Sequence, residues 1–437
     1  MRAGKGLSGL LLLAASTVAG PAAANREPAG LHQALQTLAR EGRLSGAVVV
    51  RGPEGVRFAR GYGWADPFER RAFTPDTPVD SASLAKPVTS AAVLLLVRDG
   101  KIELDAPVQR YLPEYPHSSG TVRHLLSHSA GLDFKDSPEG LANKSNAALL
   151  AASAAPLFPS GAAFTYCNLC SITLALLIER VAGMHYLDFV KGRLAVRSGV
   201  SLRPPRLKDW SGRAIGYRRK ADGQIERFDS WEGELLYGAA NFSISAAQLA
   251  DWGSEWWKSR LLPIRRAAMT PARIGRNVSG LTLGNWYCAH RGRRCHYLGH
   301  HEGFHHMLYW DADRRVSVAM VTNNALAPAF HQRLQRALVA FARNRPVAAQ
   351  QELKALLPSV EAPVGDFRIG RGELVAVKKS GSRVWVVRRG LIYPAYPTSP
   401  TIRYVPGLDA YIAGDERGRL HWISLYEDFV SLPLELR

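Results

Sequence analysis

The chain has 437 residues, of which 46% are hydrophobic and 21% are charged; these values are typical of globular proteins and argue against long disordered regions. Its formal net charge of +19 would attract anionic partners, yet we find no nucleic-acid-binding motif, and the basic residues are spread along the sequence. We therefore expect no nucleic acid partner and interpret the charge as a solvated, arginine-biased surface, with an anionic cell-envelope surface as the alternative partner.

Residues 1–24 have the pattern of an export signal. Arg2 and Lys5 give a positive start, residues 7–20 are apolar, and residues 22–24 are alanines suited to a signal peptidase. The apolar stretch is too short to span a bilayer comfortably, and no cysteine stands at the cut for a lipid anchor. A buried N-terminal helix is the alternative. We expect an exported protein, periplasmic or secreted.

Apolar periodicity then predicts elements in chain order. We expect helices over residues 31–38, 88–97, 169–181, 246–257 and 332–343, and strands over 46–51, 55–63, 307–310 and 316–321. Strands at both ends around a helical middle predict an α/β (α+β) domain whose sheet is closed by its two termini.

Composition changes near residues 346–363, and the pattern beyond is that of a small all-β domain. Strand-like segments occur at 374–378, 383–388, 401–405, 410–413 and 419–426. We therefore divide the chain into a signal (1–24), a main domain (25–345), a linker (346–360) and a β-domain (361–437).

Four cysteines are present, and export would permit disulfides between them. Cys288 and Cys295 flank a predicted turn, which favours a cross-strand bridge. Cys167 and Cys170 have the C-x-x-C spacing of redox proteins, but no thioredoxin-like βαβ pattern surrounds them. A bridge or two packed thiols is our expectation there.

Ser83 and Lys86 form an S-x-x-K motif at the start of a buried helix. The spacing of three places both side chains on one helix face, so a lysine with a lowered pKa could take the proton of the serine hydroxyl. Backbone N–H groups at a helix start could also stabilise developing negative charge. An ordinary helix with an exposed lysine is the alternative, and Pro87 is tolerable only if the helix begins near Ser83.

Tyr166 and Asn168 form a second motif. A tyrosine beside a lysine can transfer protons, and an asparagine can hold both the lysine and a substrate amide. The alternative is a buried tyrosine followed by a helix-capping asparagine.

The histidine-rich segment 299–306 has two interpretations. His301-Glu302-Gly303 can be an H-x-G strand motif that closes a serine-hydrolase site. The five residues from His301 to His305 also read H-E-x-x-H, a zinc peptidase signature that requires a helix. The glycines and aromatic residues here favour a strand or tight turn, so we expect no metal; surface histidines are the remaining alternative.

Together and in this order, the three motifs resemble the serine β-lactamase and D-alanyl-D-alanine carboxypeptidase superfamily. The resemblance is closest to the branch of class C β-lactamases, related esterases and D-amino-acid peptidases, and it covers about residues 30–345. Longer segments agree at residues 80–112, 121–132, 158–161 and 242–252. It implies an antiparallel sheet flanked by helices with an all-α lobe, and the tail resembles the small β-barrel that follows some such hydrolases.

The resemblance also implies roles. Ser83 would form an acyl-enzyme, Lys86 and Tyr166 would share the proton transfers, and Asn168 would orient Lys86 and the substrate. His301 and Gly303 would lie where relatives bind substrate, with His301 in place of a lysine. The backbone N–H groups of Ser83 and Phe304 would form the oxyanion hole.

Two residues depart from the family pattern. Glu302 replaces a hydroxyl residue that often binds a substrate carboxylate, and Phe304 adds bulk beside the oxyanion hole. Both disfavour a β-lactamase or a carboxypeptidase and favour an esterase, amidase or aminopeptidase on a neutral or cationic small molecule. Alternatively, Gly299-His300 could carry the histidine role.

The sequence thus predicts an exported serine hydrolase that uses no cofactor and cleaves an ester or amide. A non-catalytic protein that binds cell-wall fragments on the same fold is the alternative, followed by a zinc peptidase. The sequence does not specify an oligomeric state.

Overall fold

A computed structural model describes most of the main domain and the strands of the tail. The described residues are 29–133, 144–195, 211–219, 224–229, 237–240, 243–258, 261–275, 277–289, 291–326, 328–344, 365–369, 373–380, 383–388, 391–399, 402–405, 410–414, 420–424 and 431–436. The predicted signal (1–24) and linker (346–360) lie outside them.

One eight-stranded antiparallel sheet organises the main domain, in the order β2-β1-β14-β13-β12-β11-β10-β9. Its strands are β1 (Gly46–Gly52), β2 (Gly55–Tyr62), β9 (Pro271–Ile274), β10 (Asn277–Thr282), β11 (Tyr287–Ala289), β12 (Arg294–His301), β13 (Phe304–Asp311) and β14 (Val316–Thr322). Strand β1 pairs with β14 from Gly46 opposite Thr322 to Arg51 opposite Ser317. The predicted closure of the sheet by both ends of the domain is confirmed.

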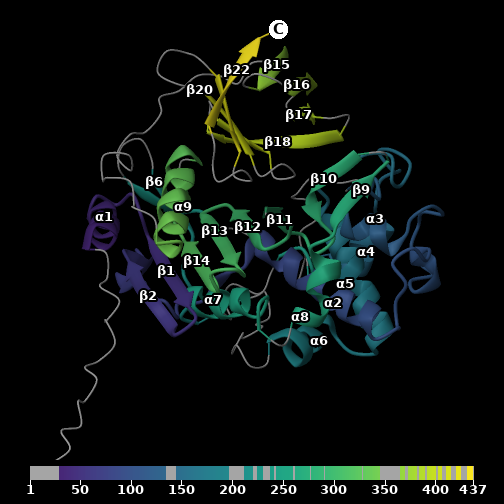
Figure 1. Cartoon of the computed structure of the whole chain (residues 1–437), viewed down its shortest axis with the longest axis horizontal. Coiled ribbons are helices and arrows are strands. Elements are labelled where there is room, and N and C mark those ends of the chain that lie inside the picture. The colour runs from purple at the N-terminus through teal and green to yellow at the C-terminus, as the bar shows by residue number, and fades with distance from the viewer. Residues whose placement is uncertain are drawn as a thin grey trace, which may run out of the picture.

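Helices cover both faces of this sheet (Figure 1). One face carries α1 (Ala29–Arg40) and α9 (Pro328–Ala342), whose leucines share a core with residues of β1, β13 and β14. On the other side lie α2 (Ala85–Arg98), α3 (Val122–Leu126), α4 (Asn146–Ala151), α5 (Asn168–Ala182), α6 (Tyr186–Val190), α7 (Ala246–Ser254) and α8 (Leu262–Ala268). The predicted α/β class with a helical lobe is therefore correct.

Short elements link these layers. They are β3 (Trp64–Asp66), β4 (Arg71–Ala72), β5 (Val79–Asp80), β6 (Tyr217–Arg219), β7 (Ile225–Arg227), β8 (Ser243–Ile244), the 3₁₀ turns η1 (Ala82–Leu84) and η2 (Val108–Arg110), and the π-turn η4 (Lys191–Ala195). Pairs β3–β4, β5–β8 and β6–β7 each form a two-stranded sheet.

The core beneath the sheet is rich in tryptophan. Trp252 and Trp256 on α7 and beside it pack against Trp286 and Trp310, with ring centroids 5.6 to 5.9 Å apart. Large rings bury much apolar area per side chain, so this cluster stabilises the contact between α7 and the sheet. Helix α7 ends at Ser254, three residues before the predicted end.

The tail forms a closed eight-stranded barrel, in which β15 pairs with β22. Its strands are β15 (Gly365–Ile369), β16 (Glu373–Ser380), β17 (Arg383–Arg388), β18 (Leu391–Ser399), β19 (Ile402–Val405), β20 (Ala410–Gly414), β21 (Leu420–Ser424) and β22 (Ser431–Leu436). The sequence pattern missed β15, β18 and β22. Prolines at 394, 397 and 433 interrupt the last two, and proline lowers the strand signal.

Two disulfides are present in the main domain. Cys288 and Cys295 lie directly opposite each other on β11 and β12, so the cross-strand pairing is correct. Cys167 and Cys170 are also bridged, which excludes the alternative of two packed thiols.

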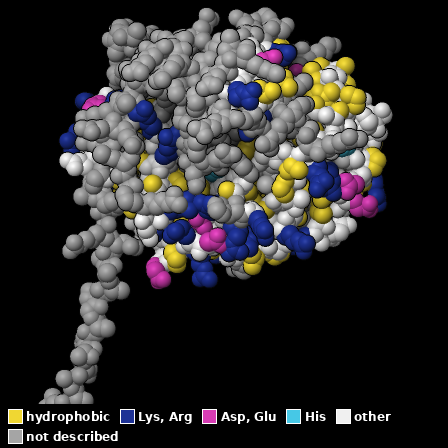
Figure 2. Space-filling model, turned by 45° about the horizontal axis from the view of Figure 1, so that its top comes forward, with side chains coloured by type: hydrophobic (Ala, Val, Ile, Leu, Met, Phe, Trp, Pro, Cys, Tyr) yellow, Lys and Arg dark blue, Asp and Glu magenta, His cyan; other side chains and the backbone are white. Residues whose placement is uncertain are grey.

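On the face shown in Figure 2, lysine and arginine side chains are scattered among acidic and hydrophobic ones.

Within the described residues no single helix is long and apolar enough to cross a membrane; α5 and the following turn of helix pass that test only as a pair bent by 79°.

Candidate active site

Ser83 lies on a strained turn between β5 and α2. The preceding residue, Ala82, has φ +46°, a left-handed conformation that non-glycine residues rarely adopt. The carboxylate of Asp80 accepts a hydrogen bond from the Ala82 N–H at 2.6 Å and holds the turn. Helix α2 then begins at Ala85, which places Pro87 in its first turn, as the sequence required. Strain of this kind is often stored at functional sites.

Lys86 is buried, with 1% of its surface exposed, and it points at Ser83. Its Nζ donates to Ser83 Oγ at 3.0 Å and to the carbonyl of Ala239 at 3.0 Å, and it lies 4.7 Å from the centre of the Tyr166 ring. Burial holds the pKa of Lys86 well below its usual value of 10.5, which favours the neutral amine that a general base requires.

Tyr166 completes a short chain of polar atoms. Its hydroxyl lies 2.6 Å from Ser83 Oγ, so the serine oxygen is within hydrogen-bond reach of both the tyrosine and Lys86. A proton leaving Ser83 therefore has two acceptors at bonding distance. The structure brings together the three residues that the sequence nominated for proton transfer.

His128, to which the sequence analysis gave no role, holds Tyr166 in place. It is fully buried, and its ring stacks on the Tyr166 ring at a centroid distance of 5.5 Å and an angle of 13°. Its Nδ1 accepts the backbone N–H of Cys167 at 2.9 Å, so Nε2 carries the proton and donates to Asn285 Oδ1 at 2.5 Å. Burial lowers the pKa of His128 to about 3, which keeps the ring neutral at ordinary pH.

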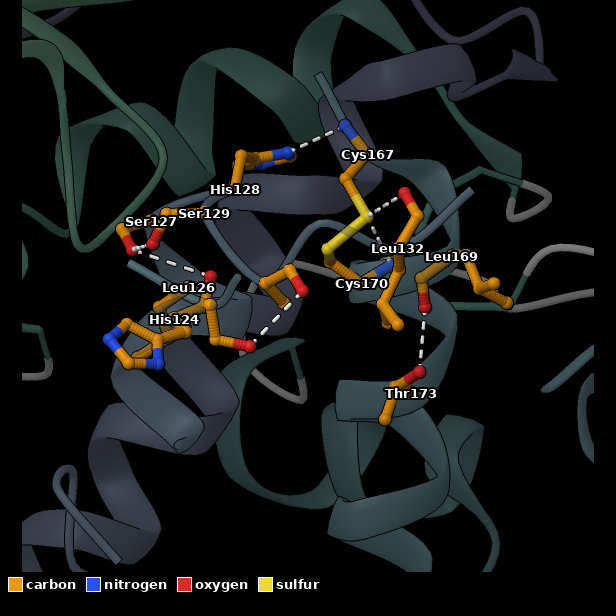
Figure 3. Close-up of a disulfide and its surroundings, with 12 residues drawn as sticks. His124, Leu126, Ser127, His128, Ser129, Leu132, Cys167, Leu169, Cys170 and Thr173 are labelled. Atoms are coloured by element: carbon orange, nitrogen blue, oxygen red, sulfur yellow. Dashed lines mark hydrogen bonds between the residues drawn. A yellow bond between two sulfur atoms is a disulfide. The ribbon is translucent and has the colours of Figure 1, made fainter. Parts of the chain in front are cut away.

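The Cys167–Cys170 bridge reinforces the same corner. Cys167 is the N-cap of α5, and its sulfur accepts the N–H of Cys170 at 2.9 Å. Figure 3 shows the bridge between the ring of His128 and the first turn of α5. The bridge therefore links the residue after Tyr166 to the helix that begins at Asn168.

Asn168 is the first residue of α5 and is partly exposed. In the part of the chain that the structure describes, Lys86 bonds to Ser83 and Ala239, and no hydrogen bond joins it to Asn168. The expected contact that would orient Lys86 is thus supplied by a backbone carbonyl. A carbonyl has no side-chain signature, so the sequence offered no signal for Ala239.

The histidine-rich segment forms a β-hairpin, not a helix. Strand β12 ends at His301, β13 begins at Phe304, and Glu302 and Gly303 form the two-residue turn between them. The H-E-x-x-H geometry of a zinc peptidase is therefore wrong for this chain, because its two histidines do not share a helix face.

The hairpin presents alternate residues to opposite sides of the sheet. Gly299 packs against the turn that carries Ser83, where a Cβ would lie 3.1 Å from the Ser81 carbonyl oxygen. His301, two residues on, lies on that same side, whereas His300 contacts α9. Of the two candidate registers, the structure places His301 on the nucleophile side.

The turn of the hairpin packs against the backbone of neighbouring segments of the chain. The Gly303 N–H donates to the Phe228 carbonyl at 2.9 Å, and a side chain at 303 would clash with the backbone of Tyr217. The Phe304 ring is buried, with 2% exposed, and lies against Gly216. The Phe304 side chain, which the sequence analysis expected to add bulk beside the oxyanion hole, therefore packs into the protein interior. The hole itself, built from the N–H groups of Ser83 and Phe304, stays a prediction.

Comparisons with known proteins agree with this geometry. A family model described as Beta-lactamase matches residues 31–342. Penicillin-binding protein 4* of Bacillus subtilis is 28% identical over 180 residues, which cover 39% of this chain and 40% of that protein. Esterase EstB of Burkholderia gladioli is 41% identical over 103 residues, which cover 22% and 26%. The matched segments thus span less than half the length of these relatives.

The fold is shared more widely than the sequence. The octameric penicillin-binding protein homologue from Pyrococcus abyssi superposes with a TM-score of 0.60 over 92% of this chain and 98% of that one, at 18% identity. At this identity the likeness concerns the fold alone.

Proposed function

The chain belongs to the Beta-lactamase family, and from this premise we propose that it is an exported serine hydrolase that cleaves an ester or amide through an acyl-serine intermediate. The family consists generally of serine hydrolases. The observation that carries the proposal is the position of Ser83 Oγ, 3.0 Å from the buried Nζ of Lys86 and 2.6 Å from the Tyr166 hydroxyl.

In the proposed reaction, Ser83 Oγ bonds to the carbonyl carbon of the substrate while Lys86 accepts its proton. The carbonyl oxygen becomes negative and is stabilised by backbone N–H groups at the start of η1 and β13. The carbon–oxygen or carbon–nitrogen bond then breaks as the proton held by Lys86 passes by way of the Tyr166 hydroxyl to the leaving group, so both side chains regain their starting protonation states. Water then bonds to the acyl carbon and gives a proton to Lys86 by way of Tyr166. The bond from that carbon to Ser83 Oγ breaks, and the proton returns to Oγ, which frees Ser83 and the acid product.

Substrate class follows from charge. Glu302 in the hairpin turn would repel a substrate carboxylate, because like charges a few ångströms apart disfavour binding by about 1 kcal/mol or more. We therefore propose a neutral or cationic ester, amide or peptide, including peptides of D-amino acids. A panel of p-nitrophenyl esters and amino-acid amides of both configurations, with and without a carboxylate, tests this choice.

Covalent labelling tests the chemistry itself. The purified chain would be treated with a fluorescent fluorophosphonate or a fluorescent penicillin, with Ser83→Ala as the matched variant. We expect stable labelling of the wild-type chain and none of the variant. Absence of both labelling and ester hydrolysis would instead favour a non-catalytic binding protein on the same fold.

Export is proposed from the charged, apolar and alanine-rich pattern of residues 1–24. Expression of the full chain in a bacterial host, followed by fractionation and N-terminal sequencing of the mature form, tests it. Recovery of the intact N-terminus from the cytoplasm would contradict the proposal.

A further inference from the structure

Three histidines meet on the side of the sheet that faces away from Ser83. His300 on β12 and His305 on β13 are cross-strand partners, and His331 reaches them from α9. Their ring centroids lie 4.9, 5.2 and 5.5 Å apart, and one nitrogen from each lies within 4.8 Å of the others. Three separate elements thus direct imidazoles at one point.

The spacing fits a metal ion. Zinc binds imidazole nitrogen at about 2.0–2.1 Å in tetrahedral geometry, which places neighbouring ligand atoms about 3.3 Å apart. His300 Nε2 and His331 Nδ1 are 3.3 Å apart. The nitrogen that His305 contributes lies within 4.8 Å of the other two.

One nitrogen of the cluster has no partner within the described structure. His300 and His331 contact each other, and His331 also contacts Gln335. His305 Nδ1 is buried and has no hydrogen-bond partner among the described residues. A buried imidazole nitrogen of this kind is available to bind a metal ion.

A second layer of contacts is also present. Gln335 lies one helical turn after His331, and its carboxamide is 3.0 Å from His331 Nε2. A metal-bound histidine usually donates its other N–H to an oxygen. Turning this carboxamide by 180° places Oε1, which has no partner among the described residues, against that N–H.

We propose that His300, His305 and His331 bind one Zn²⁺ ion, with water as the fourth ligand. Because residues 300 and 305 leave the hairpin on the side opposite His301 and Phe304, the ion does not face Ser83. It pins α9 to the β12–β13 hairpin and so stiffens the strand ends that carry the nucleophile-side residues. This site is independent of the hydrolase reaction proposed above.

Metal content tests the proposal directly. The full chain, purified without a histidine tag and stripped with a chelator, would be loaded with Zn²⁺ or Co²⁺, desalted and analysed by mass spectrometry for metal. We expect one ion per chain, the visible absorption of tetrahedral Co²⁺, and an increase in Tm of about 4 °C or more on Zn²⁺ addition.

Variants locate the ion. His331→Gln should weaken Zn²⁺ binding at least 100-fold and abolish the Tm increase, whereas His296→Gln, on the same strand β12 but outside the cluster, should bind like wild type. His305→Gln provides the same test if His331→Gln does not fold. Sub-stoichiometric metal in the wild type, or equal binding by the cluster variants, would overturn the proposal, and neither result depends on enzymatic activity.

Discussion

The two sides of the β12–β13 hairpin bury basic groups in opposite ways. Toward Ser83, the amino group of Lys86 contacts two oxygens and an aromatic ring of the chain itself. Toward α9, the imidazole of His305 keeps a buried nitrogen without a partner in the described structure. Buried polar groups are almost always satisfied, so Lys86 is accounted for within the chain, whereas His305 is one of the residues for which we propose a metal ion.

The largest effect on activity should come from removing the amino group of Lys86. Lys86→Met keeps a similar volume but leaves Ser83 without a base, so we expect kcat/KM for a p-nitrophenyl ester to fall about 10³-fold or more. Burying the amine is itself unfavourable, so the free energy of unfolding should stay the same or rise by about 1 kcal/mol. Ester assays and urea unfolding measure the two quantities.

Exposed Lys101→Met is the matched control for that variant and should change neither quantity. A Lys86→Met protein that keeps wild-type activity would show that Lys86 is not the base. A large loss of stability instead would mean that the amine of Lys86 stabilises the fold.

His128 offers the next largest effect. His128→Ala loses the bonds to Cys167 and Asn285 and leaves a cavity, which together should cost about 3 kcal/mol of stability. Because Tyr166 loses its stacking partner, kcat should fall about 30-fold with little change in KM. The partly exposed His117→Ala is the control, and an unchanged kcat would show that His128 only supports the fold.

Acid should weaken both sides of the hairpin. Burial lowers the pKa values of His128 and His305 to about 3 and of His306 to about 4, so between these values and 6.5 the unfolded chain binds more protons than the folded one. Stability is therefore full above pH 6.5 and falls below it, by about 1.4 kcal/mol per pH unit for each histidine.

Urea unfolding of the chelator-stripped chain from pH 7 to pH 4.5 measures this slope. His305→Gln should reduce the slope by the share of one histidine, and a slope independent of pH would contradict the buried neutral state.

The smallest effect concerns the Cys167–Cys170 bridge. Replacing both cysteines with serine opens a loop of four residues, so loop-closure entropy predicts a loss of about 2 kcal/mol. The position of Tyr166 should loosen, with a decrease in kcat of about threefold. The double serine variant at Cys288 and Cys295 should lose similar stability but keep its kcat, which separates the two bridges; an equal loss of kcat in both would contradict a local role.

Short-range patterns were sufficient for much of this molecule. The five longest helices, the closing strands of the sheet and the Ser83–Lys86 pair all follow from periodicity and spacing within a few turns of chain, whereas the short helices α3, α4, α6 and α8 were not predicted. The sequence analysis did not identify His128 and Asn285, because 157 residues separate them and either could be an ordinary polar residue. The cluster of His300, His305 and His331 was not identified for the same reason. The sequence motif grouped His301 with His305, and only the strand pairing shows that His300 lies opposite His305.

Because β1 pairs with β14, the sheet beside Ser83 can form only after the C-terminal strands of the main domain have been synthesised. The turn that carries Ser83 packs on β12 and β13, and the His306 ring bonds to the Asp80 carbonyl at 2.7 Å. A growing chain that has passed residue 200 already contains Ser83, Lys86 and Tyr166, yet it lacks the strands on which their turn rests. Incompletely synthesised chains should therefore lack hydrolase activity as well as a complete fold.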